Sequence, residues 1–184
     1  MQHEFWTVTC AVLIPGTLLA SWIDYAQRRV PNWLNLALLL CGLSTQAWFF
    51  GWSGVGAGLL GMLVGFGLLI VPWMMHGMGA GDVKLMAAIG AWLGPMLTLY
   101  SFGLGAVIGG VTAVVMILST GRLRMACVNI GLIMAKCSSP QTVFSEAHSA
   151  KSFGTTSQLL PYGVPLTVGT LIILAAKTLG CWGI

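Results

Sequence analysis

Residues 54–73 read GVGAGLLGMLVGFGLLIVPW, twenty consecutive residues without a charge. A helix of about 20 mostly apolar residues is long enough to cross the hydrocarbon core of a bilayer. Five further stretches are similarly apolar, at 5–23, 33–50, 83–100, 102–119 and 159–179. The sequence therefore predicts an all-α integral membrane protein, a bundle of about six transmembrane helices.

The composition excludes most soluble proteins. Of the 184 residues, 57% are hydrophobic and 7% charged, whereas soluble domains carry roughly 25% charged residues. We therefore expect membrane lipid, and no nucleic acid, among the partners. The five cysteines form no CxxC pair and the three histidines are scattered, so the spacing of a structural zinc site is absent.

The connections between the spans differ in length. Tight antiparallel hairpins are expected at 51–53 and near residue 101, where the apolar stretches almost touch. Residues 120–157 form the long connection of a single membrane-embedded domain, 1–184. Its apolar piece at 123–135 is interpreted as an amphipathic helix in the membrane interface, or alternatively as a short seventh or re-entrant span.

The basic residues predict the orientation. The chain has 8 basic and 4 acidic residues, and an excess of Lys and Arg marks the cytoplasmic side of a membrane protein. The predicted spans place seven of the eight on one side, all except Lys177: Arg28, Arg29, Lys84, Arg122, Arg124, Lys136 and Lys151. Both chain ends then face outward. Because the amino-terminal residues lack Lys and Arg, 5–23 is expected to be a retained span rather than a cleaved signal.

Glycines recur at small-xxx-small spacing within two of the spans. They are Gly54, Gly58, Gly61 and Gly65 in one and Gly105 and Gly109 in the other. Such faces let helix backbones approach closely. We interpret them as packing faces rather than as a substrate groove.

Two of the four acidic residues lie at ends of predicted spans, on the side assigned to the cytoplasm. Asp24 follows the first span and Asp82 opens the fourth. A carboxylate near the apolar region is costly unless something stabilises it. Structural roles would be an ion pair of Asp24 with Arg28 and an N-cap by Asp82.

The glycines around Asp82 favour a chemical role instead. Gly79 and Gly81 allow another part of the chain to approach closely. Two carboxyl groups that meet in a partly dry site share one proton and titrate as a unit. Such a pair can split an amide with water, one member accepting a proton from the water and the other polarising the carbonyl group. Which aspartate takes which part is left open.

Three segments resemble a known family. They are Asp24 with RVPN at 29–32, GAGDVKL at 79–85 and PYG at 161–163. Together they resemble the type IV prepilin peptidases, membrane aspartic proteases of the GxGD group. Presenilins and signal peptide peptidases, the other GxGD group, carry Tyr-Asp at the first acid, whereas this chain reads Ile23-Asp24-Tyr25.

The resemblance implies an aspartic endopeptidase of the bacterial inner membrane. It would remove the basic leader from prepilins or pilin-like secretion subunits at the cytoplasmic face, without a metal or other cofactor. Asp24 and Asp82 would be catalytic, with a supporting motif of Gly79, Gly81, Lys84, Pro31 and Asn32.

Many relatives also carry a cytoplasmic domain with two CxxC pairs that is linked to N-methylation. This sequence has no room for that domain after its first span, so we expect a peptidase without methyltransferase, as in the short forms of tight-adherence (Flp-type) pili. Two other functions remain open: a small proton- or cation-coupled transporter that uses the two aspartates, and a structural subunit of a secretion assembly.

Overall fold

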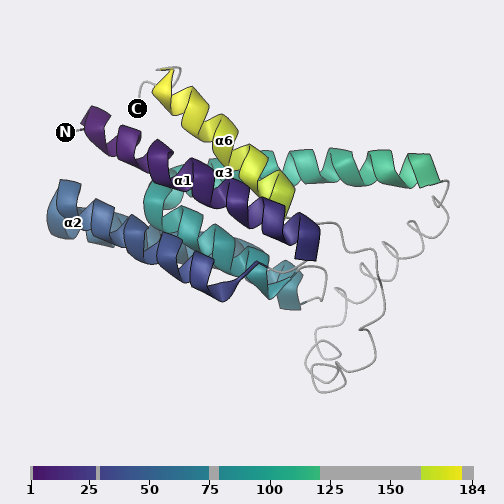
Figure 1. The fold of residues 1–184 in the computed structure, drawn as a ribbon, viewed down its shortest axis with the longest axis horizontal. Helices are drawn as coiled ribbons and strands as arrows, with labels where there is room; N and C mark the ends of the chain where they lie inside the picture. Colours follow the sequence, from purple (N-terminus) through teal and green to yellow (C-terminus); the bar gives the residue numbers. More distant parts are fainter. Residues whose placement is uncertain (1, 28–29, 75–78, 121–162, 180–184) are drawn as a thin grey trace. The chain divides into compact units, whose positions relative to one another are not determined.

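A computed structural model describes residues 2–27, 30–74, 79–120 and 163–179 (Figure 1). They form four helices: α1 (Gln2–Gln27), α2 (Asn32–Met74), α3 (Ala80–Thr120) and α6 (Gly163–Thr178). The first three are long and apolar enough to cross a membrane. The described chain is thus all-helical, as predicted, but it contains four helices, and the predicted count of six is not supported.

The chain forms two compact units, residues 1–109 with 161–184 and residues 110–160. The core and the candidate site described below belong to the first unit. The predicted long connection, including its apolar piece at 123–135, falls outside the described residues from position 121 onward and stays a prediction.

The helix count differs because α2 and α3 each contain two of the predicted spans. Gly51 interrupts α2 with φ 60° and ψ −142°, a left-handed conformation that glycine adopts without steric cost. Beyond it the chain turns back, since Gly54 packs on the backbone of Gln46 and Gly58 packs on Leu43. The two limbs of α2 are therefore antiparallel, with the turn at the predicted place.

The corresponding break in α3 is not where the sequence predicted it. Gly94 has φ 73° and ψ 177° and is followed by Pro95, which cannot donate the helical hydrogen bond. The predicted junction near Ser101 was wrong: Ser101 is fully buried inside the second limb. Its hydroxyl lies 2.8 Å from that of Thr170 in α6.

The glycine faces pack helix against helix. Gly54, Gly58, Gly61 and Gly65 are all buried. The backbones of Gly61 in α2 and Gly90 in α3 are in direct contact, and a Cβ atom on either residue would collide with the other. The interpretation of this face as a packing surface is therefore confirmed.

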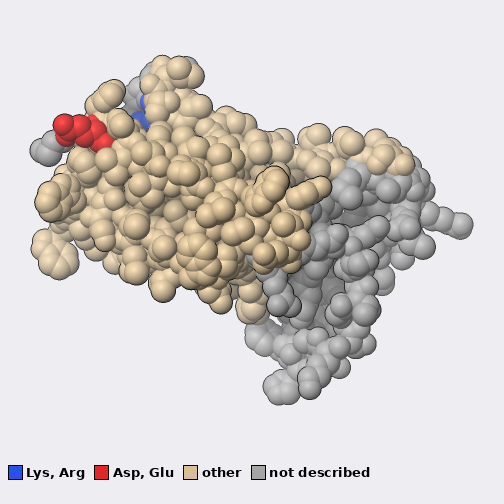
Figure 2. Space-filling view, in the orientation of Figure 1, with Lys and Arg blue, Asp and Glu red and all other residues tan. Residues whose placement is uncertain are grey.

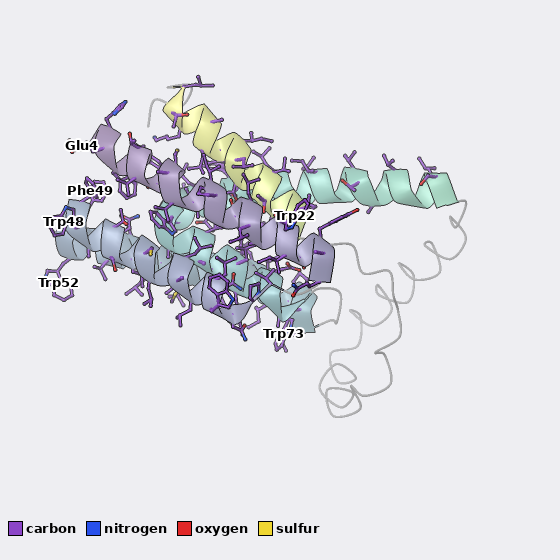
Figure 3. The ribbon with its side chains drawn as sticks, in the orientation of Figure 1. Glu4, Trp22, Trp48, Phe49, Trp52 and Trp73 are labelled. Carbon is purple, nitrogen blue, oxygen red and sulfur yellow. The ribbon has the colours of Figure 1, made fainter. Side chains whose placement is uncertain are left out.

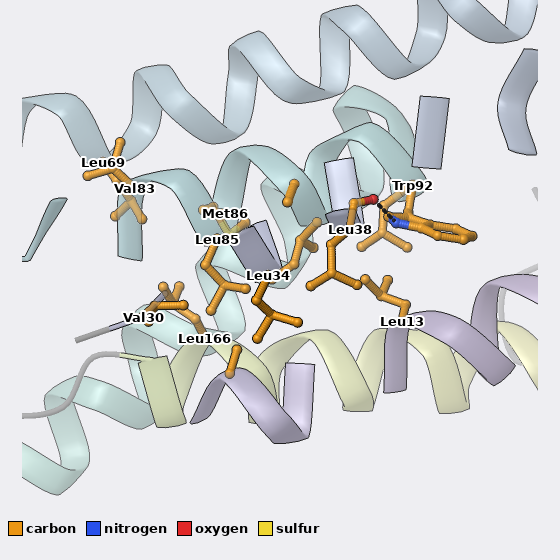
Figure 4. Packing of buried hydrophobic residues seen from close by; sticks show 14 of the residues in the cluster. Leu13, Val30, Leu34, Leu38, Leu69, Val83, Leu85, Met86, Trp92 and Leu166 are labelled. Carbon is orange, nitrogen blue, oxygen red and sulfur yellow. Dashed lines mark hydrogen bonds between the residues drawn. The ribbon is translucent and has the colours of Figure 1, made fainter. Parts of the chain in front are cut away.

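The core between α2 and α3 contains a buried tryptophan (Figure 4). The indole nitrogen of Trp92 donates a 2.8 Å hydrogen bond to the carbonyl of Leu38. The amide of Gln46 donates a 3.1 Å bond to the Trp92 carbonyl. Gly42 leaves room for the ring, because a Cβ there would lie 2.7 Å from Trp92 Cδ1. These contacts fix the first limbs of α2 and α3 side by side.

The outer surface suits lipid. Trp48, Trp52 and Trp22 are 86%, 90% and 73% exposed. Figure 3 shows Trp48 and Trp52 at one end of the helices and Trp22 and Trp73 toward the other, as expected for side chains at the two interfaces of a membrane. The face in Figure 2 is almost free of charge over the described residues. Apolar side chains are exposed along all four helices, among them Leu18, Leu36, Leu63, Val107 and Ile172.

Candidate active site

Four helix ends meet at the candidate site. Asp24 lies in the last turn of α1, and Gly163, the first residue of α6, packs directly against it. Val30, just before α2, packs on Gly81 in the first turn of α3: a Cβ on Gly81 would lie 3.1 Å from Val30 Cβ. Residues far apart in the sequence are thus collected at one end of the first unit.

The carboxyl groups of Asp24 and Asp82 are brought together there. Each aspartate is only 6% exposed, and the two groups are close enough to interact electrostatically. Asp24 Oδ2 and Asp82 Oδ1 are buried and have no hydrogen-bond partner among the described residues. Buried acceptors of this kind are rare in folded proteins. Both oxygens therefore have unused capacity to accept a hydrogen bond.

Asp82 is the third residue of α3 rather than its N-cap. Its backbone N–H donates a 3.2 Å hydrogen bond to the carbonyl of Gly79, and the backbone of Gly79 is in turn within hydrogen-bonding reach of the Asp82 carboxyl group. The contact of the Asp82 carboxyl group with the Gly79 backbone is one half of a capping box; Gly79 takes the cap position and has no side chain for the other half. The N-cap role considered for Asp82 from the sequence is therefore corrected.

Asp24 is bounded by the start of α6. A Cβ atom on Gly163 would lie 2.8 Å from Asp24 Oδ2, and the Gly163 backbone is within hydrogen-bonding reach of the carboxyl group. Gly163 is the last residue of the PYG segment; Pro161 and Tyr162 lie outside the described residues. So does Arg28, and its pairing with Asp24 stays a prediction.

The remaining predicted residues join α2 to α3. Lys84 is exposed and donates a 2.9 Å hydrogen bond to Asn32 Oδ1. The carbonyl of Pro31 accepts a 3.4 Å bond from the backbone N–H of Asn35, so that α2 begins immediately after the proline. The hydrogen bond between Lys84 and Asn32 thus joins the amino-terminal parts of α3 and α2 beside Asp82.

Three polar residues that the sequence analysis did not select also belong to the site. The amide of Asn35 donates a 3.2 Å hydrogen bond to the carbonyl of Gly81. Ser21 and Thr167 form a short hydroxyl contact between α1 and α6. The sequence did contain a signal for these two hydroxyl residues. Ser21 precedes Asp24 by three residues, and Thr167 follows Gly163 by four, so Ser21 shares a helix face with Asp24 and Thr167 shares one with Gly163.

Comparison with known proteins identifies the family. Residues 11–114, more than half of the chain and including both aspartates, match the model of the type IV leader peptidase family. The chain belongs to the type IV leader peptidase family. The resemblance drawn from Asp24 and the segments at 29–32 and 79–85 is thereby confirmed.

Relatives in the type IV leader peptidase family carry the name prepilin leader peptidase/N-methyltransferase. The protein of Aeromonas salmonicida is 34% identical over 119 residues, which cover 56% of this chain and 40% of the relative. That of Pseudomonas putida is 36% identical over 118 residues, with the same two coverages. That of Xanthomonas campestris pv. campestris is 30% identical over 138 residues, covering 71% of this chain and 48% of the relative. The chain therefore spans less than half the length of these relatives. No solved structure matches it.

Proposed function

We propose that the chain is an aspartic endopeptidase that removes the basic leader peptide from prepilins or related pilin-like subunits. One observation carries this proposal: Asp24 and Asp82, from α1 and α3, place two buried carboxyl groups close enough to interact, each with an oxygen that lacks a partner among the described residues. Membership in the type IV leader peptidase family supports the same activity.

The chemistry needs the two carboxyl groups in different protonation states. The ionised member accepts a proton from water as the water oxygen attacks the carbonyl carbon of the scissile bond. The protonated member donates a hydrogen bond to the carbonyl oxygen. As the C–N bond breaks, a proton passes to the leaving nitrogen, and the pair returns to its shared-proton state. No other side chain is required to move a proton.

We propose further that these residues perform the peptidase step without a methyltransferase step. The relatives are named for both activities. Here α1 ends at Gln27 and α2 begins at Asn32, so the connection between them leaves no space for an inserted domain. A product with an unmethylated amino terminus is the expected result.

We place the carboxyl groups at the cytoplasmic face of a bacterial inner membrane. The distribution of Lys and Arg supports this orientation, because Lys84 is the fifth residue of the helix that carries Asp82, while Lys177 lies in the last turn of α6. Both aspartates lie within one turn of a helix end. That position suits cleavage just before the apolar helix of a prepilin better than it suits an ion path through the membrane centre.

The proposal is tested by reconstituting the protein in lipid vesicles with a prepilin that carries a basic leader before an apolar segment. We expect the leader to be removed, with a mass of the new amino terminus that shows no added methyl group. The Asp82→Asn variant, which keeps the volume of the side chain, serves as the control. Ion flux that depends on both aspartates, without cleavage, would instead indicate a transporter.

A further inference from the structure

Gly163 lies so close to Asp24 that no other residue fits at this position without displacing the carboxyl group. A Cβ atom on Gly163 would lie 2.8 Å from Asp24 Oδ2, 3.3 Å from Cγ and 3.4 Å from Cβ. Contacts of a real Cβ below 3.0 Å are essentially never seen. Since both residues are buried, the carboxyl group could yield only by turning away from its present place.

The peptide unit of Gly163 is itself held by hydroxyl groups. Its carbonyl accepts a 3.1 Å hydrogen bond from Ser21 Oγ and a 2.7 Å bond from Thr167 Oγ1, and the two hydroxyls also contact each other. Ser21 stands three residues before Asp24, on the same face of α1. The start of α6 is therefore fixed to the part of α1 that carries the aspartate.

We propose that Gly163 is a positioning residue: it bounds the Asp24 carboxyl group and keeps it directed toward Asp82, and the hydroxyls of Ser21 and Thr167 hold Gly163 in place. This inference rests on the proposed peptidase function. The physical reason is that a carboxyl pair works only in a narrow geometry, and a displacement of about 1 Å can lower a catalysed rate about 100-fold.

The test compares Gly163→Ala with Gly169→Ala in steady-state cleavage of a prepilin. Gly169 lies in the same helix, and its Cβ would meet backbone rather than a side chain, at 2.5 Å from Ser101 O and 2.6 Å from Gly105 N. It is about 9 Å farther along α6. Gly169→Ala thus disturbs helix packing at least as strongly as Gly163→Ala, because it meets backbone, while only Gly163→Ala touches Asp24. Thermal unfolding measures how much stability each loses.

We expect Gly163→Ala to lower kcat about 100-fold with KM within about twofold of wild type. Gly169→Ala should keep kcat within about threefold of wild type, even if it unfolds at a lower temperature. An equal fall of kcat in both variants, or a normal kcat in Gly163→Ala, would overturn the positioning role.

A second variant covers the case in which Gly163→Ala does not fold. Ser21→Ala removes a hydroxyl that holds Gly163 without adding volume, and it should lower kcat about threefold to tenfold, in line with one lost hydrogen bond. An unchanged kcat would contradict the proposal. A wild-type protein that cleaves no prepilin would refute the peptidase function itself, whereas active wild type with equally active variants refutes the positioning role alone.

Discussion

The side-chain amide of Asn35 donates a 3.2 Å hydrogen bond to the carbonyl oxygen of Gly81. Gly81 immediately precedes Asp82, and it also packs on Val30. Asn35 is 4% exposed, so that its end of the bond is buried. The start of α2 therefore determines where the first turn of α3 lies, and with it the backbone that carries one of the two carboxyl groups.

Replacing Asn35 by Leu should lower the rate of cleavage by more than the accompanying loss of folding stability can explain. The lost hydrogen bond contributes about 1 kcal/mol to the free energy of unfolding, and a shifted Asp82 should lower kcat about tenfold. The matched control is Gln46→Leu, which removes a similar bond to α3, to the carbonyl of Trp92, about 16 Å farther along α2. Equal kcat values for the two variants would show that Asn35 only stabilises the fold.

We expect Lys84 to link α3 to α2 through its hydrogen bond with Asn32, rather than to form an ion pair with Asp82. It is exposed and bonded to Asn32, and residues two apart on a helix point in different directions. Lys84→Met should therefore destabilise the protein by less than about 1.5 kcal/mol and lower kcat less than about tenfold. Cleavage assays and thermal unfolding of the purified variant check this. A loss as large as that of an aspartate variant would place Lys84 in the catalytic machinery.

The contact between Gly61 and Gly90 predicts which glycines of α2 tolerate a methyl group. Gly61→Ala would drive its Cβ into the backbone of Gly90, and overpacking of this kind costs about 1–3 kcal/mol. Gly67 has open space within 4 Å, so Gly67→Ala should be neutral or stabilise the helix by up to about 1 kcal/mol. Unfolding midpoints in detergent compare the two. Equal destabilisation would contradict the close packing of α2 on α3.

Much of this fold could be predicted because a helix that crosses a lipid bilayer needs a long, mostly apolar stretch of sequence. Apolar stretches of spanning length indicated the helices, and Gly51 lies at the predicted turn. The break at Gly94 was missed because the residues on both sides are equally apolar, so hydropathy does not change there. The backbone angles of Gly94 mark the break, and the packing of Ser101 against Thr170 shows that the second limb had already begun.

The candidate site could be predicted only in part, again because a membrane-spanning sequence is mostly apolar. Charged residues are so rare in this chain that Asp24 and Asp82 could be selected by elimination, and Gly79 and Gly81 marked a close approach of backbone. The contacts of Ser21 with Gly163 and of Asn35 with Gly81 join residues 142 and 46 positions apart. No local pattern encodes such pairs, because they depend on how the helices pack.

The central claim is that Asp24 and Asp82 act as one unit, and a double-mutant comparison tests it most directly. The measurement is the rate of prepilin cleavage by Asp24→Asn, Asp82→Asn and the variant with both changes, each confirmed to be inserted and folded. We expect the cleavage rate of each single variant to fall at least about 1,000-fold. The double variant should be no slower than either single variant, because two groups that act as one unit lose their function when either is removed. Wild-type cleavage by either single variant, or losses that multiply in the double variant, would contradict the account.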